Sequence, residues 1–190
     1  MKSYGNVPDV LYHDNHILVV YKPPNMLTQP DQSQALSLED WTKNWLREKR
    51  QKAGPVFLHC VHRLDKPVSG LVLFACSSKA LSRLNQAVRE KQVSRFYFTE
   101  VSGHFTENKG ILKHYLVHAE HRAKTAAKTA PQAKLAILHY KVLMENLYSS
   151  VLEVELDTGR YHQIRAQLAA DHHPIIGDVK YGSKIDDVPL

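Results

Sequence analysis

The stretch Leu152-Glu153-Val154-Glu155-Leu156 alternates apolar and acidic residues without interruption. This period of two predicts a β-strand over 151–156, with one face on a core and the other in solvent. Such two-faced strands are typical of antiparallel sheets, whereas strands of parallel sheets are usually apolar on both faces. The stretch therefore favours an antiparallel sheet.

Further strands are expected on the N-terminal side of this one. Apolar or alternating runs predict strands over 16–22, 71–75, 96–99 and 135–144. In the third run, Tyr97 falls on the face opposite Phe96 and Phe98, because successive side chains of a strand point to opposite faces. Tyr97 is thereby separated from its apolar neighbours.

Helices are expected over 37–50, 78–91 and 164–168. In the first, Ser37 and Asp40 have the spacing of a capping box, and Trp41 and Trp45 share an apolar stripe that should face the core. Strands outnumber helices and do not alternate regularly with them. This favours an α+β fold, a single domain with a mostly antiparallel mixed sheet flanked by helices, over a doubly wound parallel sheet.

The composition of the 190 residues indicates a soluble, cytoplasmic protein. The first ten residues lack the apolar segment of a signal peptide, and no run approaches the roughly 18 apolar residues of a membrane span. Cys60 and Cys76 lack metal-ligand spacing and lie in apolar runs, so we expect buried, reduced thiols. No repeat or linker divides the chain, which predicts one domain over 1–190. We also expect a monomer and no membrane contact.

A net charge of +6 suggests a polyanionic partner. Between Lys109 and Lys134 the cations face Glu120 as their only acidic counterweight. Two interpretations of this span remain open, a loop that contacts phosphates and a solvated, mobile insertion.

One carboxylate stands out by its position. The segment His62-Arg63-Leu64-Asp65 precedes Gly70 and the apolar strand predicted over 71–75. Asp65 therefore lies on a loop next to a rigid element, where catalytic groups are commonly placed.

Three segments together resemble the RluA-type family of pseudouridine synthases. HRLD at 62–65, followed by Ser69-Gly70 and an apolar run, is similar to the family's active-site motif. Residues 17–24 resemble its early strand ending in Asn-Lys-Pro, with Tyr21 in place of the asparagine. Residues 158–165, 173–178 and 181–182 resemble its late signature. The segments span most of the chain in the family's order.

The resemblance implies an RNA uridine isomerase with a basic catalytic cleft and no cofactor. Its carboxylate, Asp65, adds to the base or sugar or stabilises positive charge at C1′. Arg165 matches the arginine that pairs with this aspartate, and Tyr97 matches the family's active-site tyrosine, which can stack on uracil or move a proton. We therefore expect Asp65, Tyr97 and Arg165 to be the catalytic residues.

Substrate contacts are expected from the same motifs. The target base must leave its stack, and the planar cation of Arg63 can fill the gap. His62 is expected to order that loop or approach phosphate, and Arg160, His162 and Gln163 belong to the late signature. The expected partner is structured RNA, either tRNA or rRNA. Because only about fifteen residues precede the first strand motif, we expect no N-terminal module of the S4 type.

Competing interpretations are weaker. His59 and His62, or Asp171 with His172 and His173, do not have zinc-hydrolase spacing, so no metal site is expected. Asp157-Thr158-Gly159 imitates one half of an aspartic-protease dyad, but the triplet occurs once. A non-catalytic RNA-binding protein remains the alternative function. The substitution Asp65→Asn distinguishes the two, because an enzyme should lose uridine isomerisation while it still binds RNA.

Overall fold

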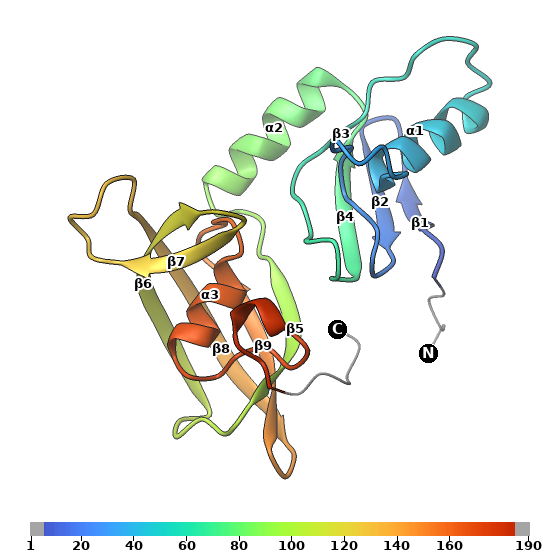
Figure 1. Cartoon of the computed structure of the whole chain (residues 1–190). Coiled ribbons are helices and arrows are strands. Elements are labelled where there is room, and N and C mark those ends of the chain that lie inside the picture. The colour runs from blue at the N-terminus through green and yellow to red at the C-terminus, as the bar shows by residue number, and fades with distance from the viewer. Residues whose placement is uncertain (1–5, 185–190) are drawn as a thin grey trace. The chain divides into compact units, whose positions relative to one another are not determined.

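Two antiparallel sheets organise residues 6–184, the part of the chain that the computed structural model describes (Figure 1). The chain divides into two compact units, Met1–Gln92 and Val93–Leu190, and each holds one sheet and an apolar core. The predicted α+β class is confirmed, because strands and helices share the chain without regular alternation. The expectation of one catalytic domain stays a prediction.

The first unit contains a four-stranded sheet in the order β1-β2-β4-β3. Its strands are β1 (Asp9–His13), β2 (Ile17–Lys22), β3 (His59–Cys60) and β4 (Gly70–Ala75). Its helices are α1 (Leu38–Lys49) and α2 (Ser78–Arg89). The central strands β2 and β4 bury one face completely, and α1 contributes to the same core. The hydrophobic residues of this core cluster that are 0% exposed are Leu18, Val20, Leu38, Val72 and Phe74.

Helix α1 begins as its sequence predicts. The Ser37 hydroxyl accepts the backbone N–H of Asp40 at 3.1 Å, and the Asp40 carboxylate accepts the Ser37 N–H at 3.4 Å. Trp41 and Trp45 pack, partly buried, against the core of this unit, which confirms their structural role. A cap of this kind stabilises a helix by about 1 kcal/mol.

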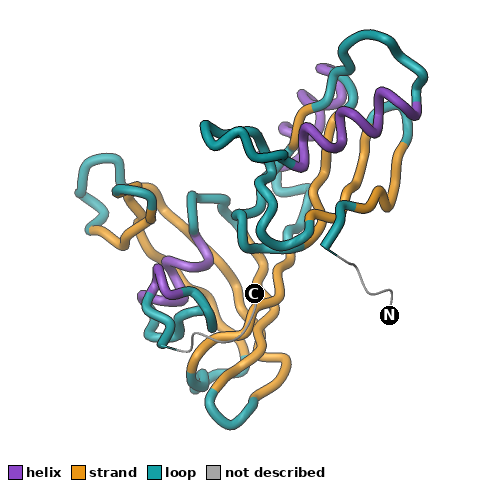
Figure 2. Tube along the Cα trace, turned by 45° about the vertical axis from the view of Figure 1, so that its right-hand side comes forward, coloured by secondary structure: helices purple, strands orange, loops and turns teal. Residues whose placement is uncertain are grey.

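The second unit contains a five-stranded sheet in the order β5-β9-β8-β6-β7. Its elements are β5 (Phe96–Ser102), β6 (Lys109–Ala119), β7 (Arg122–Ala126), β8 (Lys134–Glu145), β9 (Ser149–Leu156), α3 (Gln163–Ala170) and the 3₁₀ helix η1 (Val179–Tyr181). Leu152 and Val154 of β9 are fully buried in a core that also includes Leu168 of α3. Figure 2 shows α3 beside the long strands of this sheet. The alternation at 151–156 therefore predicted the buried face correctly.

The loop predicted between Lys109 and Lys134 is wrong for most of its length, because β6 and β7 form an antiparallel hairpin there. Leu112 and Leu116 of β6 are buried, 8% and 4% exposed. The inward position between them is His114, whose Nδ1 lies 3.3 Å from the Gln167 amide nitrogen. This polar residue interrupts the alternation of apolar residues, so the sequence pattern did not predict the strand.

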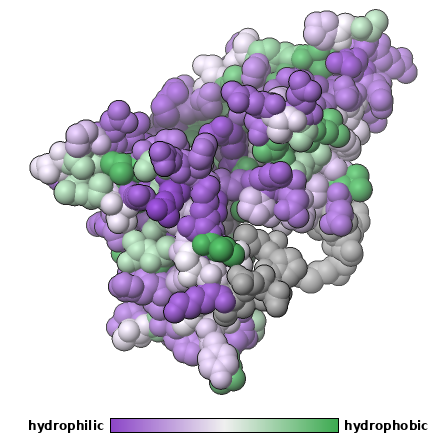
Figure 3. Space-filling view, in the orientation of Figure 1, coloured by the Kyte–Doolittle hydropathy of each residue, from purple (hydrophilic) through white to green (hydrophobic). Residues whose placement is uncertain are grey.

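Two general features of the described residues concern the length of their helices and the character of their surface. No helix of residues 6–184 has the length and apolar character needed to span a membrane. The face shown in Figure 3 is mostly hydrophilic, with apolar side chains in small groups.

Both cysteines are free, Cys76 buried and Cys60 half-buried, and burial raises the pKa of each thiol. A raised pKa keeps both as weakly reactive thiols at neutral pH.

Candidate active site

Asp65 lies on the loop between β3 and β4, and the residue before it is anchored at both backbone polar groups. The Leu64 N–H donates to the Thr28 hydroxyl at 3.1 Å, and that hydroxyl donates to the Leu64 carbonyl at 2.7 Å. Thr28 is itself buried, with 4% exposure. The Leu64 backbone is therefore tied to a separate segment of the first unit.

The residue after Asp65 is held by a buried lysine. Lys22 is 0% exposed, and its ammonium donates to the carbonyls of Lys66 at 3.1 Å, Met26 at 2.7 Å and Pro23 at 3.0 Å. Burial lowers the pKa of Lys22 to about 8, and the negative charge of Asp65 opposes this shift. Lys22 is therefore still mainly an ammonium at pH 7, buried near the Asp65 carboxylate.

These two anchors give Asp65 a defined position. The carboxylate is half-buried on a loop whose flanking residues are fixed by Thr28 and Lys22. Preorganisation of this kind is what a reacting group needs, because small displacements of a catalytic atom cost much of its effect.

His62 and Arg63 share this loop but differ in surroundings. The His62 Nε2 accepts the backbone N–H of Leu73 in β4 at 3.3 Å, so His62 helps to tie the loop to the sheet. Arg63 is exposed. Exposure leaves its guanidinium accessible to a substrate, and the RNA contact stays a prediction.

In the second unit, Arg165 of α3 forms a bidentate ion pair. Its Nε and Nη2 donate to the two carboxylate oxygens of Asp178 at 2.6 and 2.8 Å. The Asp178 side chain is 3% exposed, and the guanidinium carbon lies 4.8 Å from the centre of the Tyr181 ring. The fork geometry and the ring contact fix the plane of the guanidinium.

His162 extends this group of side chains. Its Nε2 lies 3.1 Å from Nη1 of Arg165, and its Nδ1 lies 2.9 Å from the Tyr181 hydroxyl. These two contacts hold the imidazole between Arg165 and Tyr181, and the Tyr181 hydroxyl oxygen also accepts the backbone N–H of Ala123 at 2.7 Å.

The backbone at His162 is in the left-handed region, with φ of 48°. Seven other non-glycine residues among 6–184 also have a positive φ, so this conformation alone does not mark a functional site. It places His162 at the N-cap of α3, directly before the helix that carries Arg165.

Gln163 and Arg160 brace the turn before α3. Gln163 is 3% exposed; its carbonyl oxygen accepts from the Arg160 N–H at 2.9 Å and from the Thr158 hydroxyl at 2.8 Å. Its amide nitrogen donates to the Ile137 carbonyl at 3.0 Å. Arg160 is exposed, and its Nε donates to the Leu135 carbonyl at 3.1 Å. In this arrangement Gln163 positions the turn, whereas the Arg160 guanidinium is at the surface.

Tyr97 is half-buried on β5 and packs against the core of the second unit. Phe96 and Phe98 are 54% and 68% exposed on the opposite face. The predicted division of these side chains between two faces is therefore confirmed.

The expected site residues thus form two groups, one in each unit. The loop 62–65 carries His62, Arg63 and Asp65, whereas the second group combines Tyr97 with Arg160, His162, Gln163 and Arg165. The expected pairing of Asp65 with Arg165 joins the two units and stays a prediction. Sequence reasoning missed four supporting residues, namely Lys22, Thr28, Asp178 and Tyr181.

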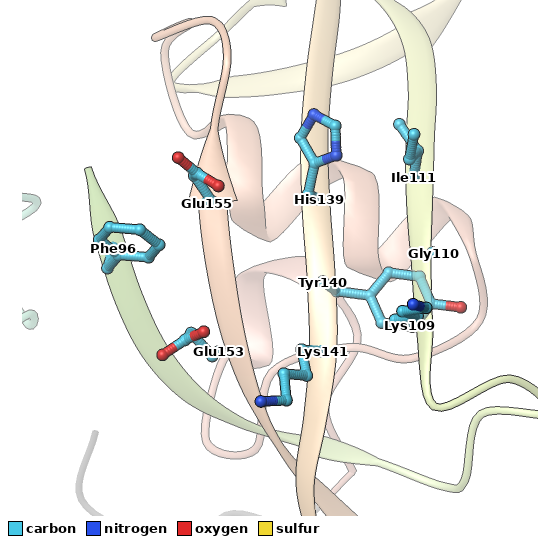
Figure 4. A pocket seen from close by; sticks show the side chains of 9 residues that line it. All are labelled: Phe96, Lys109, Gly110, Ile111, His139, Tyr140, Lys141, Glu153 and Glu155. Carbon is cyan, nitrogen blue, oxygen red and sulfur yellow. The ribbon is translucent and has the colours of Figure 1, made fainter. Parts of the chain in front are cut away.

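A cavity of about 480 Å³ lies on the face of the five-stranded sheet that carries Phe96 (Figure 4). Figure 4 shows Glu153 and Glu155 of β9 between Phe96 on one side and His139 and Lys141 on the other. Carboxylates at its centre repel phosphates, so this cavity does not suit a nucleic acid. Among residues 6–184, no three histidine, cysteine, aspartate or glutamate side chains group closely enough to hold a metal ion.

The model of the RNA pseudouridylate synthase family matches residues 16–170. The chain belongs to the RNA pseudouridylate synthase family. This confirms the resemblance drawn from the segments at 17–24, 62–70 and 158–182, because most of the three lie within the matched range.

Curated relatives of this family match almost the whole chain. The uncharacterised RNA pseudouridine synthase YhcT of Bacillus subtilis is 32% identical over 183 residues, 95% of this chain and 59% of the relative. Ribosomal large subunit pseudouridine synthase D of Vibrio cholerae is 32% identical, covering 93% and 53%. Synthase C of Rickettsia prowazekii is 34% identical, covering 92% and 56%. The chain spans just over half the length of these relatives.

Two solved structures share the fold. Human RNA Pseudouridylate Synthase Domain Containing 4 aligns with a TM-score of 0.77 at 23% identity, covering 90% of this chain and 68% of that one. Human RNA Pseudouridylate Synthase Domain Containing 1 aligns with a TM-score of 0.76 at 22% identity, covering 97% and 74%. The predicted pseudouridine synthase-like fold is therefore confirmed.

Proposed function

We propose that the chain isomerises uridine to pseudouridine in RNA, with Asp65 as the essential carboxylate. Membership of the RNA pseudouridylate synthase family supports the reaction class. The observation that carries the assignment to Asp65 is its double anchorage, by Thr28 on one side and Lys22 on the other. A solvated surface carboxylate needs no such support.

The reaction breaks the bond between N1 and C1′, turns the uracil and forms a bond between C5 and C1′. C5 loses a proton and N1 ends with one, so the reaction needs no oxidant, cofactor or added atom. The Asp65 carboxylate either adds to the base or sugar or stabilises positive charge at C1′. Both roles require the ionised form of Asp65, and the charge of this carboxylate acts on the buried Lys22 ammonium.

Arg165 and Tyr97 have complementary roles in this proposal. Arg165 pairs with the Asp65 carboxylate in this proposal, and Asp178 and Tyr181 hold the guanidinium in one orientation. Tyr97 stacks on the uracil, and its hydroxyl moves the proton that leaves C5. His162 orients Arg165 through the contact at 3.1 Å.

The substrate in this proposal is a structured RNA from which the target uridine is flipped. Unstacking costs a few kcal/mol, which stacking of the Arg63 guanidinium in the vacated position offsets in part. Two relatives carry names of ribosomal large subunit enzymes, so large-subunit rRNA is the first RNA to test and tRNA the second. We further propose that a monomer performs the reaction in the cytoplasm.

Pseudouridine mapping in total RNA from cells with and without the gene tests this proposal. At least one site should disappear on deletion, return with the wild-type gene and stay absent with Asp65→Asn. Asp9→Asn, an exposed aspartate on β1 of the same unit, is the matched control and should restore the site. If wild-type protein binds RNA but no site depends on the gene, the non-catalytic RNA-binding function replaces the enzyme.

A further inference from the structure

A second cavity of the second unit, of about 380 Å³, is called here the Tyr161 pocket. It lies between the β6–β7 hairpin, the start of β8 and the turn before α3, and its lining residues are Leu116, His118, Ala123, Gln132, Lys134, Gly159, Arg160 and Tyr161. Lys134 pairs with Leu116 across the sheet, so both side chains project from the same face. The volume falls within the range of small-ligand sites.

The charges of the Tyr161 pocket suit a phosphate. Lys134 and Arg160 contribute two cations, and none of the lining residues is acidic. The bond from Arg160 Nε to the Leu135 carbonyl fixes that guanidinium beside the pocket. The cavity in Figure 4, in contrast, includes Glu153 and Glu155 beside its lysines. Of these two cavities, the Tyr161 pocket is the one whose charges complement a polyanion.

The pocket also has an aromatic wall. Tyr161 is 41% exposed, and its ring meets His118 edge-on with 4.6 Å between ring centres. The Tyr161 hydroxyl donates to the His121 carbonyl at 3.3 Å, which holds the ring in place. Exposed aromatic rings beside cations are the usual means by which proteins bind unpaired bases.

The pocket is connected to the Arg165 group within the same unit. The Tyr161 ring stacks on His162 with 3.9 Å between ring centres and 17° between planes. His162 in turn contacts Arg165. A ligand bound against Tyr161 therefore lies one stacked ring away from the side chains that we assign to catalysis.

We propose that the Tyr161 pocket binds an unpaired nucleotide of the RNA substrate other than the target uridine. Its base packs against Tyr161 and His118, and its phosphate lies near Lys134 and Arg160. This inference rests on the proposed function for the identity of the RNA as substrate. It adds a second nucleotide-binding site, and Tyr161, His118 and Lys134 as residues that contact the RNA.

Affinity measurements on the full chain with a labelled single-stranded RNA test the pocket independently of catalysis. Tyr161→Leu should weaken binding about five- to 150-fold, the range of one base-stacking interaction, whereas Tyr161→Phe should keep most of the affinity. Lys134→Gln should reduce the slope of log affinity against log salt by about 0.7, the value for one phosphate contact on a single strand. Tyr161→Leu should leave that slope unchanged. Lys141→Gln, in the cavity of Figure 4, is the charge-matched control and should bind like the wild type.

Uridine monophosphate titrated into the wild-type protein gives a second readout that does not depend on the stability of variants. It should shift the backbone amide signals of Gly159 and Ala123, and inorganic phosphate at the same concentration should not reproduce the full shift. Equal shifts with both probes, or none, overturn the nucleotide site, as does wild-type affinity in Tyr161→Leu. If the gene forms pseudouridine while Tyr161→Leu binds normally, only this inference fails. If Tyr161-dependent binding persists without any isomerisation, only the proposed function fails.

Discussion

Lys22→Met tests whether a buried ammonium holds the Asp65 loop. Methionine keeps most of the length of the side chain but removes three hydrogen bonds to the carbonyls of Pro23, Met26 and Lys66. Hydrogen bonds from a charged donor are worth about 1.5–3 kcal/mol each. Against this stands the cost of burying the charge, about 3 kcal/mol for a pKa lowered from 10.5 to about 8. We expect a net loss of roughly 1–6 kcal/mol in the free energy of unfolding.

Urea unfolding of the full chain measures this loss as a lower transition midpoint. Because the Lys66 carbonyl is released, we also expect kcat for isomerisation to fall at least tenfold at temperatures where the variant is folded. Lys66→Met is the control: it removes an exposed side chain but keeps the backbone carbonyl that Lys22 contacts, so its free energy of unfolding should change by less than about 0.5 kcal/mol. A Lys22→Met variant as stable and active as the wild type would refute the reasoning.

Three further predictions follow from the pKa of Lys22, the Arg165 ion pair and the packing of β6. Because the pKa of Lys22 is about 8 in the folded chain and 10.5 when exposed, the unfolded chain binds more protons between these values. This group therefore makes stability rise with pH across that window, and unfolding curves of Lys22→Met should lack this rise; the same slope in both proteins would contradict it. Asp178→Asn breaks the bidentate pair at 2.6 and 2.8 Å and should lower kcat/KM for isomerisation about tenfold or more, with unchanged activity as the contrary result. Gly110→Ala places a Cβ 2.6 Å from the Tyr140 hydroxyl oxygen and should cost about 1–3 kcal/mol in urea unfolding, whereas Gly54→Ala, with open space around it, should be close to neutral. Equal stability of these two glycine variants would show that the Tyr140 ring does not constrain the strand.

Much of the fold could be predicted because its pattern is local. The alternation of β9 and the capping box of Ser37 depend on residues a few positions apart, and both predictions were correct. The β6–β7 hairpin could not be predicted in this way. His114 takes an inward position in β6, and the partner that accounts for it, Gln167, lies 53 residues away.

The candidate site likewise contains residues that sequence motifs predict and residues that they do not. Asp65, Tyr97 and Arg165 could be proposed because they fall in motifs that resemble a family. Lys22 could not be assigned a role, since lysine is almost never fully buried unless its charge is satisfied, and its acceptors are backbone carbonyls that no sequence pattern reveals. Asp178 is within the quoted late signature, but its ion pair with Arg165 depends on the turn between α3 and η1.

Tritium release tests the central claim most directly. Because C5 of the target uracil loses its hydrogen when it bonds to C1′, RNA prepared with tritium at C5 of uridine should release label to water as pseudouridine forms. We predict one equivalent per target site with wild-type protein and none with Asp65→Asn, while both bind the RNA with similar affinity. Release by Asp65→Asn at a rate near that of the wild type would contradict the assignment of Asp65 as the essential carboxylate.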